Sequence, residues 1–176
     1  MRNLLQFIVI TLLLISCSKS SKNNVIADKN NNSTTKVINE KKKEPSNYVI
    51  TKSGLTANEI VQNLKQSINE RGLTIFSEFS HHKSAQEVGY ELSFNHVIVF
   101  GNPKIGTKLM QCDQKIGLEL PLKVLVYTNK KGNTFISYTK PQFYNENYRL
   151  GKCKKVLNNI GKMLKQLTQE AANKNN

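Results

Sequence analysis

The sequence predicts a single two-layer domain of the α+β class with a mostly antiparallel sheet, which follows a signal peptide and a flexible tether. Segments with the alternating or β-branched pattern of strands are interrupted by segments with the 3.6-residue period of amphipathic helices. A turn sequence around Gly132 joins the last two strand segments as a hairpin. The length of 176 residues fits one domain with additional segments.

The first strand and the first helix are predicted within residues 48–72. Tyr48–Ile50 is a short strand candidate. Thr56 and Glu59 have the spacing of a capping box, in which the Thr56 hydroxyl accepts from the Glu59 amide and the Glu59 side chain reaches back. Apolar residues then follow at helical spacing, and Gly72 stands where a left-handed cap ends a helix.

The remaining elements are predicted from the same two patterns. The strands that follow are rich in β-branched residues, and Gly132 takes the hairpin position that needs a positive φ. The last segment has apolar residues on one face only, which is typical of a helix packed on a sheet. The predicted ranges are strands over 73–79, 96–100, 121–127 and 134–138, a short helix that begins near His81, and a closing helix over 153–172.

The first 16 residues have the proportions of a secretory signal. Arg2 precedes an apolar run over Leu4–Ile15, which is too short to span a membrane as a helix. The run ends in Leu14-Ile15-Ser16-Cys17, which resembles the bacterial lipobox. That resemblance implies diacylglyceryl transfer to the Cys17 thiol, cleavage before it and acylation of the new amino group. The alternatives are a plain signal peptide or an uncleaved anchor.

Residues 17–47 are expected to form a disordered tether after the lipidated Cys17. Residues 18–47 contain no aromatic residue, few aliphatic ones and many Asn, Lys, Ser and Thr residues, so they cannot bury enough apolar surface to offset the entropy of ordering. Ser18 follows Cys17 in the chain. In enterobacterial lipoproteins an Asp at this position directs the protein to the inner membrane, and this chain has no Asp there. We therefore expect an outer-membrane anchor with the domain, residues 48–176, in the periplasm.

The chain is strongly basic, with 26 Lys and Arg residues against 12 Asp and Glu residues and a formal net charge of +14. The basic face of the last helix could contact anionic lipid or lipopolysaccharide, or it could follow from composition alone, because Lys and Asn are abundant throughout the chain. A nucleic-acid partner is not expected, because the signal removes the domain from the cytoplasm and the sequence lacks a stacking-aromatic motif. The expected partners are the membrane, through Cys17, and an unidentified small ligand or envelope protein.

Three sets of residues resemble the bacterial and archaeal family of domains of unknown function numbered 302. They are the segments Phe100–Met110 and Leu118–Val126, with Gly132 and Tyr138 after them, and the spaced residues His81, Ala85 and Gly89. The resemblance implies a β-α-β4-α layer related in fold to one half of the TATA-binding protein saddle. It brings no activity and no DNA function with it.

The chain departs from the family pattern at three positions. Ser80 stands where an acidic residue usually precedes the histidine, Glu119 replaces an Asp, and Cys112 replaces a small residue. Two hypotheses on function remain open. The first is a non-enzymatic envelope module that binds a small ligand or a partner. The second is an enzyme or a metal-handling domain that uses His81 near the Gly101–Thr107 loop.

The candidate ligand-binding residues from the loop are Gly101, Asn102, Gly106 and Thr107, with Lys104 and Lys108 flanking them. Backbone amides of such a loop could bind an anion. However, the spacing matches neither a dinucleotide fingerprint nor a P-loop, and Gly, Asn and Pro also serve a tight turn without a ligand. The turn is the favoured interpretation.

The other candidates are His81, Lys123 and Tyr138. His81 is either a ligand or general base, or a histidine that caps the helix or packs on the sheet. Lys123 interrupts an apolar strand, so it either lines a cleft with Tyr138 and His81 or extends along the surface with its ammonium in water. No catalytic residue, metal or cofactor is assigned, because no carboxylate or thiol stands at ligand spacing from the histidines.

Two cysteines remain after Cys17 is lipidated. In an oxidising compartment Cys112 and Cys153 could pair and close a loop of about 41 residues, which would stabilise the fold by about 3–4 kcal/mol. Two free thiols are the alternative, because the sequence does not place their Cα atoms.

Overall fold

The computed structural model describes residues 46–173, and the signal peptide, Cys17 and most of the expected tether lie outside them. Five strands form one sheet in the order β1-β5-β4-β3-β2, in which every pair of neighbours is antiparallel. The elements are β1 (Tyr48–Ser53), α1 (Ala57–Glu70), β2 (Thr74–Ser80), α2 (His81–Glu87), β3 (Asn95–Gly101), α3 (Pro103–Cys112), the 3-10 helix η1 (Gln114–Leu118), β4 (Leu122–Thr128), β5 (Thr134–Thr139), α4 (Pro141–Asn147), the 3-10 helix η2 (Gly151–Cys153) and α5 (Lys154–Asn173).

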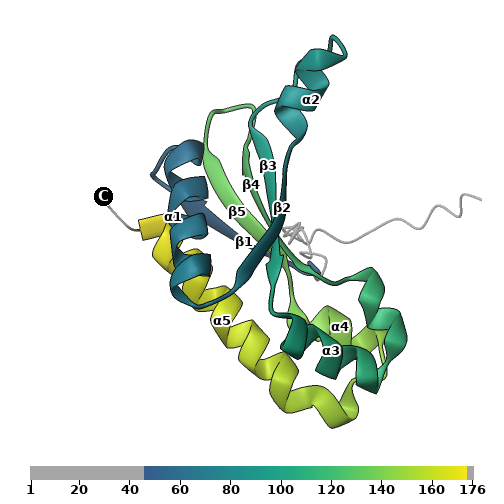
Figure 1. Cartoon of the computed structure of the whole chain (residues 1–176). Helices are drawn as coiled ribbons and strands as arrows, with labels where there is room; N and C mark the ends of the chain where they lie inside the picture. Colours follow the sequence, from purple (N-terminus) through teal and green to yellow (C-terminus); the bar gives the residue numbers. More distant parts are fainter. Residues whose placement is uncertain (1–45, 174–176) are drawn as a thin grey trace, which may run out of the picture. The chain divides into compact units, whose positions relative to one another are not determined.

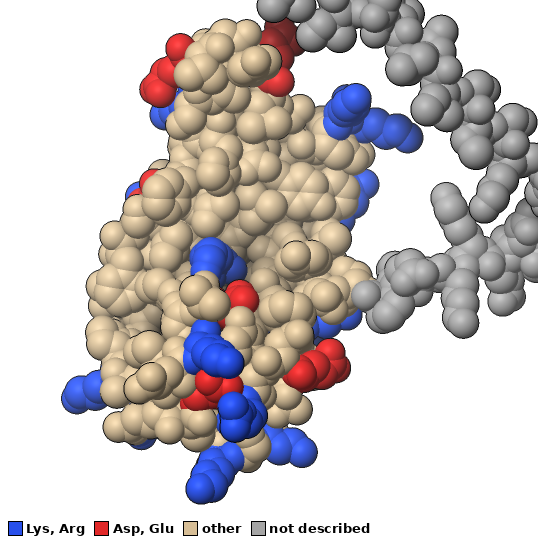
Figure 2. Space-filling model, turned by 90° about the vertical axis from the view of Figure 1, so that its right-hand side faces the viewer, with Lys and Arg blue, Asp and Glu red and all other residues tan. Residues whose placement is uncertain are grey.

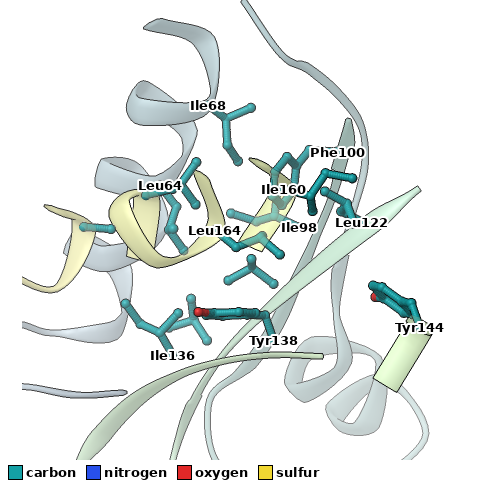
Figure 3. Close-up of a cluster of buried hydrophobic side chains, with 14 of the residues drawn as sticks. Leu64, Ile68, Ile98, Phe100, Leu122, Ile136, Tyr138, Tyr144, Ile160 and Leu164 are labelled. Carbon is teal, nitrogen blue, oxygen red and sulfur yellow. The ribbon is translucent and has the colours of Figure 1, made fainter. Parts of the chain in front are cut away.

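Helices α1 and α5 lie against one face of the sheet, so the domain has two layers (Figure 1). The inward residues of the central strands are fully buried between these layers, as Val124 and Val126 of β4 show. Helix α5 turns a row of apolar residues toward the same core (Figure 3). The predicted α+β class, with its five-stranded antiparallel sheet, is therefore confirmed.

The local signals read from the sequence act as expected at three points. Thr56 Oγ1 accepts from the Glu59 amide at 3.3 Å, and a Glu59 carboxylate oxygen accepts from the Thr56 amide at 2.8 Å. Gly72, with φ of 64°, lies just after α1, and Gly132, with φ of 76°, lies in the turn between β4 and β5. Both positions lie in the left-handed region, where glycine is the least strained residue.

The expected Gly101–Thr107 loop is corrected by the structure. Gly101 ends β3, Asn102 caps α3 through a 2.9 Å bond from the Lys104 amide to its side-chain oxygen, and Pro103 takes the first helical position. Gly106 therefore lies inside a helix rather than in a turn. The reason is that Asn followed by Pro starts a helix as readily as it makes a turn.

The second face of the sheet has no helix over its centre in the described part of the chain (Figure 1). Tyr127 and Phe135 pair across β4 and β5 on this face and stack with ring centroids 5.3 Å apart. Tyr48 and Ile50 of the edge strand β1 are more than half exposed. Seen from this side, the middle of the surface is largely uncharged, and most of the charged side chains gather toward one end (Figure 2).

A disulfide joins Cys112, the last residue of α3, to Cys153 in η2. The two Cα atoms are 6.4 Å apart and the cysteines are separated by 41 residues in the chain. The link therefore connects the end of α3 to the residue before α5 and closes a covalent loop that contains η1, β4, β5 and α4.

Within residues 46–173, no helix combines the length and the apolar character that spanning a membrane requires.

We predict that replacing both cysteines by serine lowers the free energy of unfolding by about 3–4 kcal/mol, because the unfolded chain regains the entropy of a loop of this length. Urea unfolding of the wild type and of Cys112→Ser/Cys153→Ser, each with and without a thiol reductant, measures the effect. Reductant should bring the wild type to the level of the variant and leave the variant unchanged. Equal stability of the variant and the oxidised wild type would contradict the structural role of this link.

Candidate functional site

An apolar cleft lies where β3 passes into α3. One part, with a volume of about 350 Å³, lies between α3, η1 and the beginning of β4. A second part, of about 400 Å³, lies between α3 and α5. The two parts share five lining residues, so they adjoin each other, and together they are called the apolar cleft below. The shared residues are Gly101, Asn102, Ile105, Leu122 and Ile160.

The floor of the apolar cleft is part of the hydrophobic core. Leu122 and Ile160 line both parts of the cleft and also belong to the buried cluster between the sheet and α5 (Figure 3). Phe76, which lies at a bulge in the edge strand β2, forms one side of the mouth. A ligand in this cleft would contact aliphatic and aromatic carbon over most of its surface.

Two glycines, Gly101 and Gly106, line the apolar cleft. A methyl group at Gly101 would lie 3.6 Å from the Phe76 ring, and one at Gly106 would lie 3.7 Å from Leu120. These are ordinary contact distances, so a Cβ is tolerated at either position, while a longer side chain at Gly106 would extend into the space that the cleft occupies. Glycine in a helix costs roughly 1 kcal/mol relative to alanine, so a longer side chain at Gly106 would stabilise the helix while it reduced the volume of the cleft.

The segments that border the cleft are fixed by polar contacts. Asp113, between α3 and η1, accepts from the amides of Lys115 and Arg149 at 3.1 and 3.0 Å. These backbone hydrogen bonds lower the pKa of the Asp113 carboxyl. The Tyr148 hydroxyl donates to Glu119 at 2.8 Å, and this contact raises the pKa of Tyr148. The bond from Tyr148 thus fixes Glu119, a departure from the family pattern, next to Leu120, which lines the cleft.

Lysines supply the charge at the mouth of the cleft. Lys108 of α3 and Lys155 of α5 line its second part, and both side chains are exposed. Neither lysine forms an ion pair within residues 46–173. The lining of the two parts contains no Asp, Glu, His or Cys. The apolar cleft therefore presents hydrophobic walls with cations at one rim.

The structure brings together four of the seven sequence-predicted ligand residues and separates the other three. Gly101, Asn102, Gly106 and Thr107 all line the apolar cleft. His81, Lys123 and Tyr138 do not line it.

The interpretation that Lys123, Tyr138 and His81 share a cleft is corrected. Lys123 points away from the core and donates to the carbonyl oxygens of Glu119 and Pro121, whereas Tyr138 is buried on the opposite face of the sheet. His81 is exposed at the first position of α2, with its ring 6.4 Å from that of Phe79.

A polar network near α2 was missed from the sequence. A Glu78 carboxylate oxygen lies 3.0 Å from His96 Nε2, and Ser80 Oγ lies 2.8 Å from His96 Nδ1. The other Glu78 oxygen pairs with Lys65 of α1 at 2.7 Å. Ser80 and Glu78 alternate on β2, and Ser80 is the register partner of His96 on β3. The sequence does show polar residues at inward strand positions. It does not show that they contact one another, because that depends on the register in which β2 pairs with β3.

The network has the order serine, histidine, carboxylate, which also occurs in hydrolases. If His96 carries its proton on Nε2, it donates to Glu78 and accepts from Ser80. Lys65, however, already neutralises the carboxylate, and Ser80 does not line the apolar cleft. We therefore infer that the network is structural and stabilises the packing of the edge strand β2 against its neighbour β3 and helix α1. Burial raises the pKa of Glu78, but the hydrogen bonds from Lys65 and His96 outweigh it and the pKa is lowered.

No group of three or more His, Cys, Asp or Glu side chains within residues 46–173 is arranged to hold a metal ion. His82, the neighbour of His81, lies with Nδ1 3.1 Å from the Asn95 carbonyl oxygen and stacks on Phe94. Two of the three histidines, His82 and His96, therefore have structural partners.

Comparison with known proteins places most of the described region in one family. The sequence model of the family described as "Domain of unknown function DUF302" matches residues 49–167. The crystal structure of an uncharacterized conserved DUF302 protein from Bacillus stearothermophilus superposes with a TM-score of 0.61 at 21% identity, over 71% of this chain and 98% of that one. At this identity the likeness shows the fold alone.

Curated relatives are similar over a shorter part. Two proteins named fluoride-specific ion channel FluC 1, from Brucella suis and Brucella abortus, are each 29% identical over 106 residues, which is 60% of this chain. The aligned part makes up 42% and 39% of their own lengths, so this chain spans about two fifths of the relatives it matches.

We predict that the Glu78 network makes the fold sensitive to acid. Because the pKa of Glu78 is lower in the folded state than in the unfolded state, its contribution is present above the ordinary glutamate pKa and is lost as the pH falls through the folded value. Glu78→Gln should therefore cost about 1 kcal/mol at pH 7 and progressively less below pH 5. Urea unfolding between pH 3 and pH 7 measures this difference, with the exposed Glu87→Gln on α2 as the control. A deficit in Glu78→Gln that stayed constant over this pH range would contradict the prediction.

Proposed function

Since the chain belongs to the DUF302 family, whose description assigns no function, we propose one from its own structure. The protein is a membrane-anchored envelope module that binds a small apolar ligand in the apolar cleft and catalyses no reaction. Its anchor is the lipidated Cys17, and residues 17–47 are the tether that carries the domain into the periplasm from the outer membrane.

The observation that carries the proposal is the lining of the apolar cleft. Ligand sites are commonly concave, mostly apolar and about 300–1,000 Å³ in volume, and this cleft has those properties. Its lining contains Gly101, Asn102, Gly106 and Thr107. General acid–base catalysis needs a positioned proton donor or acceptor, usually a His or a carboxylate, and the lining has neither. Binding is therefore favoured over the alternative of an enzyme that uses His81.

The membrane placement rests on the lipobox and on the relatives. Three acyl chains on Cys17 would exceed the two signals that stable membrane attachment requires. The curated relatives are named as ion channels, which are membrane proteins, and a part of them resembles this domain. This supports a domain that works beside a membrane. Fluoride conduction is not carried over to this chain, because the likeness is 29% and covers only two fifths of those proteins.

We predict that Gly106→Leu weakens binding of the neutral apolar dye N-phenyl-1-naphthylamine by at least about tenfold. The Leu side chain would occupy part of the cleft, so the dye would lose the burial of a similar apolar surface, which contributes about 2 kcal/mol. The same change should leave the melting temperature equal or higher, because it removes a glycine from a helix. Fluorescence titration and thermal unfolding of the domain from residue 46 onward measure the two effects.

Lys104→Leu is the matched control, because it adds a leucine to an exposed position of the same helix that does not line the cleft. It should bind the dye as the wild type does. The domain is suitable for this test because the described residues 46–173 belong to one compact unit, and the solved neighbour consists almost entirely of this fold. Undiminished dye binding by a folded Gly106→Leu domain would remove the cleft as the ligand site.

We predict that Cys17→Ser leaves an unprocessed and non-acylated precursor, because the thiol is the group that receives the diacylglyceryl chain. Labelling of cells with radioactive palmitate, followed by gel electrophoresis of the full chain, measures acylation and processing together. Ser16→Ala, which keeps a small residue before the cysteine, is the control and should be labelled normally. Normal labelling of Cys17→Ser would rule out this anchor.

A further inference from the structure

We infer that the ligand of the apolar cleft is a single-chain anionic amphiphile, with its chain in the cleft and its anionic head at Lys108 and Lys155. This inference rests on the proposed function and names the class of ligand. It follows from the position of these two lysines, from the charges on the two helices that carry them, and from the size of the cleft.

Lys108 and Lys155 belong to the two helices that form opposite walls of the second part of the cleft, α3 and α5. Both side chains are exposed, and within residues 46–173 neither pairs with an acidic group. Their ammonium groups can therefore reach a head group at the rim while their aliphatic stems lie along the apolar wall. Asn159, also at this rim, adds an amide that can donate to an anion.

The walls carry cations without neutralising acids. Helix α3 contains Lys104 and Lys108 and no Asp or Glu. Helix α5 contains four lysines and no acidic residue before Glu170, which is near its other end. Low-dielectric walls lined by charge of one sign raise the local concentration of the opposite ion. The mouth of the cleft therefore attracts an anionic head and repels a cationic one.

The apolar lining of the cleft indicates that the rest of the ligand is an alkyl chain. The residues that line both parts of the cleft are three aliphatic residues, a glycine and the capping asparagine. They therefore offer carbon contacts to a chain and few hydrogen bonds to a sugar or a nucleotide. Each buried methylene group contributes about 0.8 kcal/mol, which makes an alkyl chain the group that gains most from this lining. Volumes of about 350 and 400 Å³ suit one chain rather than the several chains of a complete membrane lipid.

Four ligands with the same twelve-carbon chain test the inference. Dodecanoate and dodecyl phosphate carry an anionic head, dodecanol carries a neutral one and dodecyltrimethylammonium carries a cationic one. Each is titrated against N-phenyl-1-naphthylamine bound to the domain, at concentrations below its micelle concentration or, for dodecanol, below its solubility limit. We expect both anions to bind about five- to tenfold tighter than dodecanol, as two solvent-exposed charge pairs would give, and the cation to bind weakest. The ratio of dodecanoate to dodecyl phosphate distinguishes a free fatty acid from a phosphate head.

Variants assign the preference to the two lysines. Lys108→Met/Lys155→Met should reduce the preference for dodecanoate over dodecanol to less than about twofold and leave dodecanol binding unchanged. Lys154→Met, next to Lys155 on α5 but outside the lining, is the matched control and should retain the preference. Raising the salt concentration from 50 to 500 mM should weaken the anions and spare dodecanol.

The possible results separate the inference from the proposed function. Equal binding of dodecanoate and dodecanol, both lost in Gly106→Leu, would overturn the anionic head and keep the apolar ligand. An anion preference that survives in Lys108→Met/Lys155→Met would overturn the role of these lysines. Failure of all four ligands to displace the dye, together with dye binding that Gly106→Leu leaves intact, would overturn the proposed function itself.

Discussion

The structure depends on the packing of α5 across one face of the sheet. Its apolar side, which includes Leu164 and Leu167, is almost completely buried against α1 and the inward residues of the strands. Polar contacts fix its far end, where Ser53 donates to the Ala172 carbonyl oxygen at 2.7 Å and Asn63 donates to that of Ala171 at 3.2 Å. The same helix forms one wall of the apolar cleft, so the core and the candidate site share one element.

Strand β3 separates two kinds of chemistry at its two ends. At its beginning, His96 joins the polar network with Glu78 and Ser80, and this network ties an edge strand to its neighbours. At its end, Gly101 opens into the apolar cleft. The histidine with the most polar partners therefore lies at the other end of the strand from the apolar cleft.

Much of the fold could be predicted from the sequence because its signals are local. The capping box at Thr56, the glycine at position 132 and the strand and helix periodicities each depend on a few neighbouring residues. The site could be predicted only in part. Asn102 and Pro103 were correctly placed after a strand, but helix initiation and a tight turn use the same residues there. The Glu78 network depends on strand pairing, which no local signal contains. The outward position of Lys123 and the buried position of Tyr138, in contrast, follow the alternation along their own strands.

The disulfide has a consequence for when the domain can take up a ligand. Cys112 ends α3 and Cys153 precedes α5, so the covalent link holds together the two helices that form the walls of the apolar cleft. While the thiols are reduced, the spacing of those walls rests on non-covalent packing alone. Oxidation would therefore fix the spacing of these walls, and reduction would loosen it. Under the proposed function, in which a signal peptide directs the chain to an oxidising compartment, the covalent link would form where the ligand is bound.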